Sequence, residues 1–360
     1  MKALVLKAYQ QFAYEDVAAP EPAPGEVLIA VKACGICGSD VHGMDGSTGR
    51  RRPPIIMGHE AAGVIARVGS GVNGWAAGDR VTPDSTIYCG DCEFCRRGLI
   101  NLCDNRRVLG VSCGEYRQHG AFAELVAVPQ HILYRLPEGL PFEHAALVEP
   151  FSIALHAVCR APNWFEMALQ SKGFGGGVPS NTETGAVVVG TGMIGLALVQ
   201  VLNRAGCGRI IAVDIAPERL ALAAKVGATN TINSAAENAL DAILRLTEGR
   251  GADLAFEAVG VTATVDLALR CVRKGGAVTL VGNVAPSIEF PLQTAVTREL
   301  TIYGSCASRG EYPSCLEMLA RGDLQAAPII SATAPLADGA TWFDRLYRKE
   351  PGLLKVVLTP

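Results

Sequence analysis

The chain has 360 residues, of which 49% are hydrophobic and 19% charged, and its formal net charge is −3. This composition is typical of a globular protein, and the length allows two domains of ordinary size. Without an extended basic run interleaved with aromatic residues, the sequence gives no sign of binding nucleic acid. No apolar run approaches the ~20 residues that span a bilayer, and the N-terminus lacks a signal-peptide pattern. We therefore expect a cytoplasmic protein with no nucleic-acid or membrane partner.

Two patterns of hydrophobicity follow one another along the chain. Short alternating runs separated by Gly and Pro turns occupy about the first 130 residues and predict a β-rich, barrel-like domain. From residue 151 onward, helical periodicity at 151–160 and 193–206 alternates with apolar runs such as AVVVG, RIIAVD, LAFEAVG and AVTLVGN. Such runs are typical of parallel strands buried by helices, so this part predicts βαβ units. Residues 161–185 are rich in Gly, Ser and Thr in their second half and predict an extended loop.

Four of the 12 cysteines are clustered with the spacing C-x2-C-x2-C-x7-C: Cys89, Cys92, Cys95 and Cys103. A two-residue spacer lets neighbouring thiolates converge on one ion, and Zn²⁺ accepts four of them in a tetrahedron. The flanking sequence is polar and rich in turn residues, so it offers little to bury without an ion. The pattern predicts a closed, structural zinc site; two disulfides or a chance cluster are the alternatives.

A second set of metal-ligand residue types is dispersed: Cys37, His59, Glu60 and Glu149. Three protein ligands and one open position are the arrangement of a catalytic zinc. Each residue also has a structural explanation. Cys37 could form a redox pair with Cys34, His59 could be a loop histidine, and Glu149 could be a carboxylate at a helix start.

The sequence GAVVVGTGMIGLALVQ contains the pattern G-x-G-x-x-G between an apolar strand and a helix. In that context the glycines allow a tight turn and let the backbone approach a pyrophosphate at the helix N-terminus. Asp214 ends the next apolar strand, where a carboxylate binds ribose hydroxyls and repels a 2′-phosphate, which favours NAD over NADP. An ordinary turn residue is the alternative for Asp214. The predicted cofactor-binding residues are Gly190, Gly192, Met193, Ile194, Gly195, Asp214 and Arg219.

Together these motifs resemble the zinc-containing medium-chain alcohol dehydrogenases. CGICGSDVH, GHE, GDRV, the four-cysteine segment, GAFAE, the EP before a helix and GTGMIG cover essentially the whole chain. Glu149 together with GHE is similar to the polyol branch of sorbitol, xylitol and galactitol dehydrogenases. The resemblance implies an α/β protein whose β-rich GroES-like catalytic domain spans 1–157 and 295–360, with a structural zinc lobe at 89–103. A doubly wound Rossmann domain at 158–294 would bind NAD.

The resemblance also implies roles for individual residues. Cys37 and His59 would bind the catalytic zinc, and Glu60 and Glu149 would share the carboxylate role, directly or through water. Ser39 would take the substrate proton and His42, unless it is a plain surface histidine, would pass it toward solvent. The implied activity is oxidation of a secondary alcohol of a polyol or diol to a ketone with NAD. Two zinc ions per chain and a homodimer or homotetramer are implied as well.

Two departures from the polyol branch affect the expected substrate. Ala307 and Ser308 stand where sorbitol dehydrogenases usually carry an Arg–aromatic pair, and Gly43–Met44 replaces an aromatic residue after the zinc motif. A threonine- or butanediol-type dehydrogenase is therefore an alternative within the family. A non-catalytic NAD(H)-binding relative is a second alternative, against which the intact set of metal-ligand residues argues.

Overall fold

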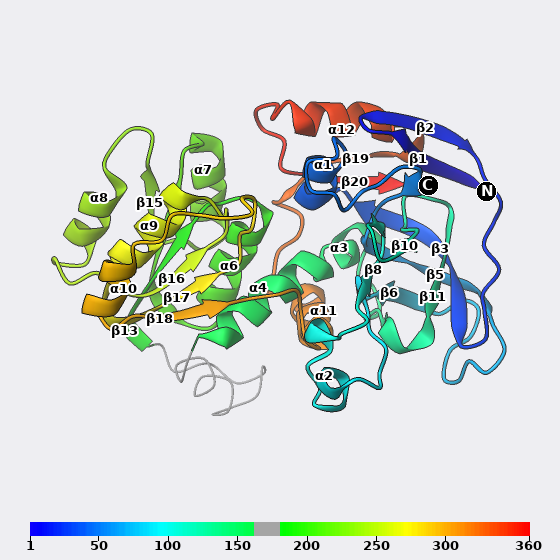
Figure 1. Ribbon diagram of the computed structural model, residues 1–360, viewed down its shortest axis with the longest axis horizontal. Coiled ribbons are helices and arrows are strands. Elements are labelled where there is room, and N and C mark those ends of the chain that lie inside the picture. Colours follow the sequence, from blue (N-terminus) through cyan, green and yellow to red (C-terminus); the bar gives the residue numbers. More distant parts are fainter. Residues whose placement is uncertain (162–180) are drawn as a thin grey trace. The chain divides into compact units, whose positions relative to one another are not determined.

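The computed structural model describes residues 1–161 and 181–360 (Figure 1). Contacts within the chain divide it into two compact units. Unit 1 consists of Met1–Glu149, Cys315–Gly322 and Ile330–Pro360, and unit 2 consists of Pro150–Ser314 and Asp323–Ile329. The domain boundaries drawn from the sequence at 157 and 294 stay predictions. No helix in the described ranges is long and apolar enough to cross a membrane.

Unit 1 is built around β3 (Glu26–Gly35), whose residues are buried along most of its length. β3 pairs antiparallel with β5 (Glu60–Val68), β11 (Leu125–Pro129) and β20 (Lys355–Thr359) in a seven-stranded sheet. The sheet is completed by β6 (Arg80–Pro83), β12 (Leu133–Arg135) and β19 (Ile330–Pro335). The remaining strands are β1 (Lys2–Ala8), β2 (Gln11–Asp16), β4 (Ile55–Ile56), β7 (Thr86–Ile87), β8 (Arg107–Val108), β9 (Val111–Ser112) and β10 (Arg117–Gln118).

The predicted β-rich first part of the chain is confirmed, because unit 1 holds only short helices beside these strands. They are α1 (Gly38–Gly43), α2 (Glu93–Arg96), α3 (Phe142–Ala146) and α12 (Gly339–Tyr347). Three aromatic rings fill part of the core: the centroid of Phe343 lies 4.6 Å from that of Phe12 and 5.6 Å from that of Phe122. Phe122 and Phe343 are fully buried, so a segment near the C-terminus contributes to the core of the first domain.

Unit 2 contains a six-stranded parallel sheet in the order β15-β14-β13-β16-β17-β18. Counted from β13, this is the order 3-2-1-4-5-6 of a doubly wound dinucleotide-binding sheet, so the predicted fold class is confirmed. The strands are β13 (Asn181–Val189), β14 (Cys207–Asp214), β15 (Asn230–Asn233), β16 (Ala252–Glu257), β17 (Val272–Leu280) and β18 (Thr301–Gly304). The helices among its described residues include α6 (Met193–Arg204), α7 (Pro217–Lys225), α8 (Ala239–Leu246), α9 (Thr262–Cys271) and α10 (Leu292–Thr297). Two further helices, α4 (Val148–Arg160) and α11 (Tyr312–Arg321), have residues in both units.

The loop predicted at 161–185 is wrong for its last five residues. β13 begins at Asn181 and pairs in parallel with β14, with an irregular register between Asn181 and Gly185. The polar composition hid this start, because the strands were predicted from their apolar runs. The rest of the predicted loop, 162–180, lies outside the described residues.

Candidate active site

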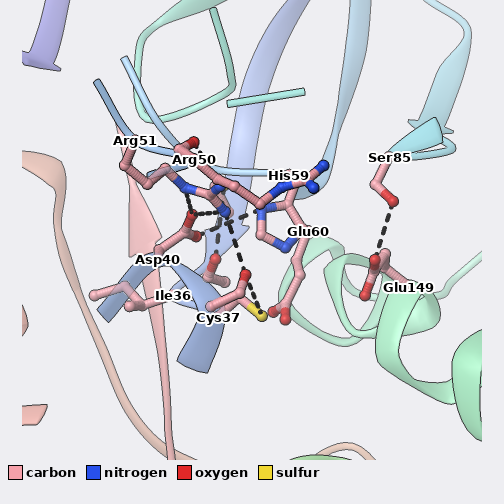
Figure 2. A network of polar contacts seen from close by, with 12 residues as sticks. Ile36, Cys37, Asp40, Arg50, Arg51, His59, Glu60, Ser85 and Glu149 are labelled. Carbon is pink, nitrogen blue, oxygen red and sulfur yellow. Dashed lines mark hydrogen bonds and ion pairs between the residues drawn. The ribbon is translucent and has the colours of Figure 1, made fainter. Parts of the chain in front are cut away.

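Three of the dispersed ligand residues, Cys37, His59 and Glu60, come together where β3 ends and β5 begins (Figure 2). Gly35 of β3 pairs with Glu60 of β5, so strand pairing brings the residues that follow β3 to those that precede β5. One ligand atom from each of the three residues lies within 4.8 Å of the others. His59 is 5% and Glu60 1% exposed. A thiol, an imidazole and a carboxylate are a donor set that suits Zn²⁺.

The carboxylate of Asp40 on α1 faces the Nδ1 atom of the His59 ring. The Oδ2 atom of Asp40 and Nδ1 of His59 are 3.5 Å apart, and Asp40 is fully buried. Neither atom has a hydrogen-bond partner among the described residues. A metal-bound histidine commonly donates its other ring N–H to a carboxylate. The geometry therefore suits a tautomer with the hydrogen on Nδ1 and the lone pair of Nε2 free for an ion.

The two candidate carboxylates have different partners. Lys355, which is 1% exposed, donates from Nζ to both oxygens of Glu60 at 2.8 and 2.6 Å, and to the carbonyl of Ile36 at 3.0 Å. Glu149 instead accepts a hydrogen bond from Ser85 Oγ at 3.0 Å (Figure 2). Among the described residues, Glu149 lies outside the group of mutually close ligand atoms. The structure thus brings Glu60 to Cys37 and His59, and turns Glu149 toward Ser85.

Burial and neighbouring charges shift the protonation equilibria of this site. Burial raises the pKa of Glu149 to about 7, with His59 opposing the rise and Glu60 adding to it. Burial, followed by the charge of Glu60, raises the pKa of the Cys37 thiol to about 12. A divalent cation would reverse this effect, because a thiol that coordinates a metal loses its proton. With a cation bound, Cys37 would therefore act as a thiolate ligand.

The four clustered cysteines also converge, on a separate point in unit 1. Their ligand atoms all lie within 4.8 Å of one another. The sulfur of Cys89 is 3.5 Å from that of Cys103 and 4.0 Å from that of Cys95. These separations are far longer than the ~2.05 Å of a disulfide. The arrangement is that of four thiols around one ion site.

The segment that carries these cysteines supplies its own polar contacts and little apolar burial. The backbone N–H of Cys89 donates to the sulfur of Cys103 at 3.3 Å, and that of Cys95 donates to the sulfur of Cys92 at 3.4 Å. Hydrogen bonds from the backbone at Cys95 and Asp104 lower the pKa of Cys92 to about 7. No residue of α2, which lies inside the segment, is buried. With so little apolar burial, a bound ion would stabilise the shape of this segment.

The glycine-rich turn lies between β13 and α6 in unit 2. Gly190 has φ of +90°, and a β-carbon on Gly195 would lie 1.8 Å from the carbonyl oxygen of Gly190, so both positions require glycine. Around Gly192 the space is different, because a β-carbon there would meet no described atom within 4 Å. Gly192 precedes the first turn of α6, where Met193 and Ile194 present backbone N–H groups. This open cradle at a helix N-terminus suits a pyrophosphate.

Asp214 ends β14 beside this turn, and its carboxylate is well bonded. Oδ2 accepts from the backbone N–H and the hydroxyl of Thr191 at 2.7 and 3.0 Å. Oδ1 accepts from the backbone N–H groups of Ile215 and Ala216 at 2.8 and 3.0 Å. Arg219 follows on α7. The carboxylate thus ties the end of β14 to the glycine-rich turn.

Comparisons with known proteins agree with this geometry. Residues 23–138 match the alcohol dehydrogenase GroES-like domain, and residues 194–321 match a family described as zinc-binding dehydrogenase. The chain is 35% identical to sorbitol dehydrogenase of Bacillus subtilis (strain 168), covering 100% of this chain and 97% of that protein. It is 34% identical to L-idonate 5-dehydrogenase of Vitis vinifera, covering 87% of this chain and 81% of that protein. The chain belongs to the zinc-binding alcohol dehydrogenase family.

A solved structure supports the same relationship. The alcohol dehydrogenase TADH from Thermus sp. ATN1 has a TM-score of 0.88 and 34% sequence identity, with 100% of this chain and 99% of that chain covered. The predicted resemblance, the GroES-like and Rossmann-type fold, and the prediction that the protein is an oxidoreductase enzyme are therefore confirmed. In this dehydrogenase the side chains of Asp40 and Lys355 are 0% and 1% exposed. Buried charged groups therefore contact the candidate ligand residues.

Ser39 and His42 are both exposed on α1 of the dehydrogenase, three residues apart, a spacing at which side chains share a helix face. The Ser39 hydroxyl donates to Cys37 Sγ at 3.3 Å. The predicted relay residues therefore lie on one helix beside the ligand group.

Several residues of the site were not foreseen from the sequence: Asp40, Arg51, Ser85 and Lys355. Asp40 stands inside the same motif as Cys37, so its position beside a ligand cysteine was a usable signal. Lys355 is 295 residues from Glu60, and local patterns carry no information about such a pair. For Arg51 the only hint was the short basic stretch at 50–52.

Proposed function

We propose that this dehydrogenase oxidises a secondary alcohol of a polyol or a similar diol to a ketone, with NAD as the hydride acceptor. The observation that carries the proposal is the convergence of Cys37, His59 and Glu60 within 4.8 Å of one another, with Ser39 exposed beside them. Its relatives include proteins named sorbitol dehydrogenase and L-idonate 5-dehydrogenase, which favours a polyhydroxy substrate over a simple alcohol.

The dispersed residues would hold a catalytic zinc. Bound there, the ion would act as a Lewis acid on a substrate oxygen and lower the pKa of its hydroxyl. Cys37 and His59 are the first two ligands in this proposal, and Asp40 orients the imidazole of His59. Glu60 is the nearer carboxylate. Glu149, whose pKa is raised to about 7, would act as the exchangeable partner that can leave Ser85 for the ion.

The proton of the substrate hydroxyl would leave through α1. Ser39 has an oxygen that can accept a hydrogen bond from the substrate while its own hydrogen is donated onward. His42 lies on the same face of α1 and is exposed, so its imidazole can take that proton and exchange it with water. One proton therefore passes from the substrate to solvent for each hydride that goes to the nicotinamide.

We propose NAD rather than NADP from the residues at the end of β14. A buried carboxylate at Asp214 would repel a 2′-phosphate, and neither Ile215 nor Ala216 offers a cation to balance it. Met193 and Ile194 would bind the pyrophosphate with their backbone N–H groups, and Arg219 would cover the adenine. All four hydrogen bonds to Asp214 come from within the protein, so the residue would also hold the turn in its binding conformation.

The four-cysteine segment would hold a second, structural zinc, giving two ions per chain. We also propose a cytoplasmic homodimer or homotetramer. Leu292 and Val296 on α10 are 66% and 68% exposed, and among the described residues β18 is an edge strand of the sheet in the same unit. Exposed apolar side chains and sheet edges are typical of surfaces that another subunit covers.

A substrate panel with metal analysis tests this proposal. Sorbitol, xylitol, galactitol, butanediol and threonine are each offered with NAD or NADP, and reduced-nicotinamide absorbance is followed. We expect activity with NAD on a polyol or diol and two zinc ions per chain. Activity only with threonine would contradict the substrate class, and preference for NADP would contradict the role of Asp214. Absence of any alcohol oxidation by zinc-loaded protein would refute the whole proposal.

A further inference from the structure

A single buried arginine joins the Ser39 hydroxyl to the carboxylate that faces His59. Arg51 is 4% exposed and forms an ion pair with the fully buried Asp40 (Figure 2). Its Nε and Nη2 atoms lie 3.0 and 2.8 Å from Asp40 Oδ1. Nη2 also donates to Ser39 Oγ at 3.2 Å, and Nη1 donates to the carbonyl of Arg50 at 3.1 Å. The guanidinium is therefore fixed on three sides.

The contact with Ser39 fixes the direction of its hydroxyl hydrogen. A guanidinium has five N–H donors and no acceptor, so Ser39 Oγ must be the acceptor in its bond with Arg51. The hydrogen of Ser39 then points elsewhere, and in the structure it is donated to Cys37 Sγ. One lone pair of Oγ stays available for another hydroxyl. A residue that accepts a substrate proton needs this free lone pair.

The contact with Asp40 fixes the other end of the network. Arg51 binds Oδ1 of Asp40, and Oδ2 of the same carboxylate faces Nδ1 of His59. Both N–H groups that Arg51 gives to Asp40 converge on Oδ1, so Arg51 fixes the position of that oxygen and thereby restricts the direction in which Oδ2 points. One side chain thus orients both the hydroxyl beside Cys37 and the carboxylate behind His59.

Gly43 makes room for this side chain. A β-carbon at Gly43 would lie 2.5 Å from Cγ and 3.4 Å from Cβ of Arg51, and 3.2 Å from Oγ1 of Thr48. Gly43 does not have a positive φ, so its backbone does not require glycine. Glycine is needed at this position because a larger residue would occupy the space of the Arg51 side chain. This requirement accounts for the absence of an aromatic side chain at this place, which the sequence showed as a departure from the polyol branch.

We propose that Arg51 is a positioning residue for the oxidation, acting through Ser39 and through Asp40 on His59, and that Gly43 admits it to the site. The part that concerns Ser39 rests on the proposed function. The part that concerns Asp40 and His59 requires only that the ligand group binds a metal. The two parts call for separate measurements.

Two variants and one control test the proposal in the full-length protein. Arg51→Lys keeps a cation against Asp40, but a single ammonium cannot reproduce the fork that reaches Ser39 as well. Gly43→Ala leaves Arg51 in the sequence and removes its space. Arg52→Lys is the matched control, because Arg52 is the neighbouring arginine and is exposed. All three retain the net charge.

The first measurement needs no substrate. Cobalt(II) is bound in place of zinc, because the visible absorption of cobalt distinguishes a site with one thiolate from a site with four. A chelator is then added, and the rate at which each site loses cobalt is measured. We expect Arg51→Lys and Gly43→Ala to lose cobalt from the one-thiolate site about tenfold faster than wild type, as for loss of a residue that orients a ligand. Arg52→Lys should match wild type. Wild-type rates in both test variants would overturn the link through Asp40.

The second measurement tests proton transfer through Ser39 by steady-state kinetics. With the best substrate of the panel, we expect kcat to fall about tenfold to a hundredfold in both variants, with KM changed less than about twofold. The solvent deuterium isotope effect on kcat should rise, because a misdirected Ser39 hydroxyl slows proton transfer; a merely structural defect would not move it. A wild-type isotope effect in both variants would overturn the link through Ser39. Cobalt release still decides the other link if the panel shows no oxidation at all. If Gly43→Ala does not fold, Arg51→Lys alone decides both.

Discussion

Unit 1 contains two groups of metal-ligand residues that are built in opposite ways. Cys37, His59 and Glu60 come from separate places in the sequence, are brought together by the pairing of β3 with β5, and are surrounded by buried charged partners. The four cysteines at 89–103 come from one short segment whose helix α2 buries none of its residues. Strand pairing and buried side chains position the first group, whereas the second group lies in a segment with little apolar burial of its own.

The difference indicates what an ion contributes at each place. Where buried groups such as Asp40 and Lys355 contact the ligand residues, the protein itself contributes to the geometry of the site, and a bound metal would supply the chemistry. Where only sulfur and backbone groups converge, the free energy of metal binding is the free energy of folding for that segment. Loss of a ligand should therefore remove activity in one case and local structure in the other.

Cys37→Ser should have the largest effect on activity. Removal of a thiolate from the open site leaves the substrate without its Lewis acid, so we expect kcat to fall by at least about a thousandfold. The melting temperature and NAD affinity should change little, because the β3–β5 pairing and unit 2 do not depend on this ligand. Steady-state kinetics, calorimetry and NAD titration measure the three quantities, and metal analysis should give one zinc per chain. Turnover at the wild-type rate would refute the assignment of Cys37.

Cys95→Ser should show the reverse pattern. With one thiolate fewer, the segment at 89–103 loses its ion and opens, and trypsin should cleave after the exposed Arg96 or Arg97 at least about tenfold faster than in wild type. We expect kcat per correctly assembled chain to fall far less than in Cys37→Ser. Peptide mapping locates the cut and size-exclusion chromatography follows assembly. A variant that binds one zinc, resists trypsin and assembles normally would contradict the structural role.

The same contrast explains what the sequence could and could not predict. The cysteine cluster was visible because its ligands are close in sequence, and the parallel sheet was visible because buried strands and helices alternate. The dispersed group was proposed from the types of its residues and needed the family resemblance for support, since no local pattern brings residue 37 to residue 59. Lys355 and Arg51 were missed because their partners are set by tertiary packing, which places Lys355 against Glu60 across 295 residues of chain. Domain boundaries and site roles stay predictions.

A smaller effect should come from His119, which helps hold the strand before the ligand histidine. Its Nδ1 accepts a hydrogen bond from the backbone N–H of Ile56 at 3.2 Å, three residues before His59. Burial, with a contribution from Arg117, lowers the pKa of His119 below its ordinary value of 6.5. A protonated ring would have no lone pair for Ile56, so the folded state requires the neutral form.

The sign of the pH effect follows from this shift. Above about pH 6.5 the His119 ring is neutral in both the folded and the unfolded protein, so it does not reduce the free energy of unfolding. As the pH falls below that value, the unfolded chain binds the proton before the folded protein does. Stability should therefore decline as the solution is acidified, and His119→Gln, whose amide oxygen can still accept from Ile56, should decline less steeply. Urea unfolding of both proteins at about pH 7.5 and about pH 6 measures the difference. Equal declines would mean that the segment carrying His59 is not held by a neutral His119, and would weaken the view that the protein alone shapes the catalytic group.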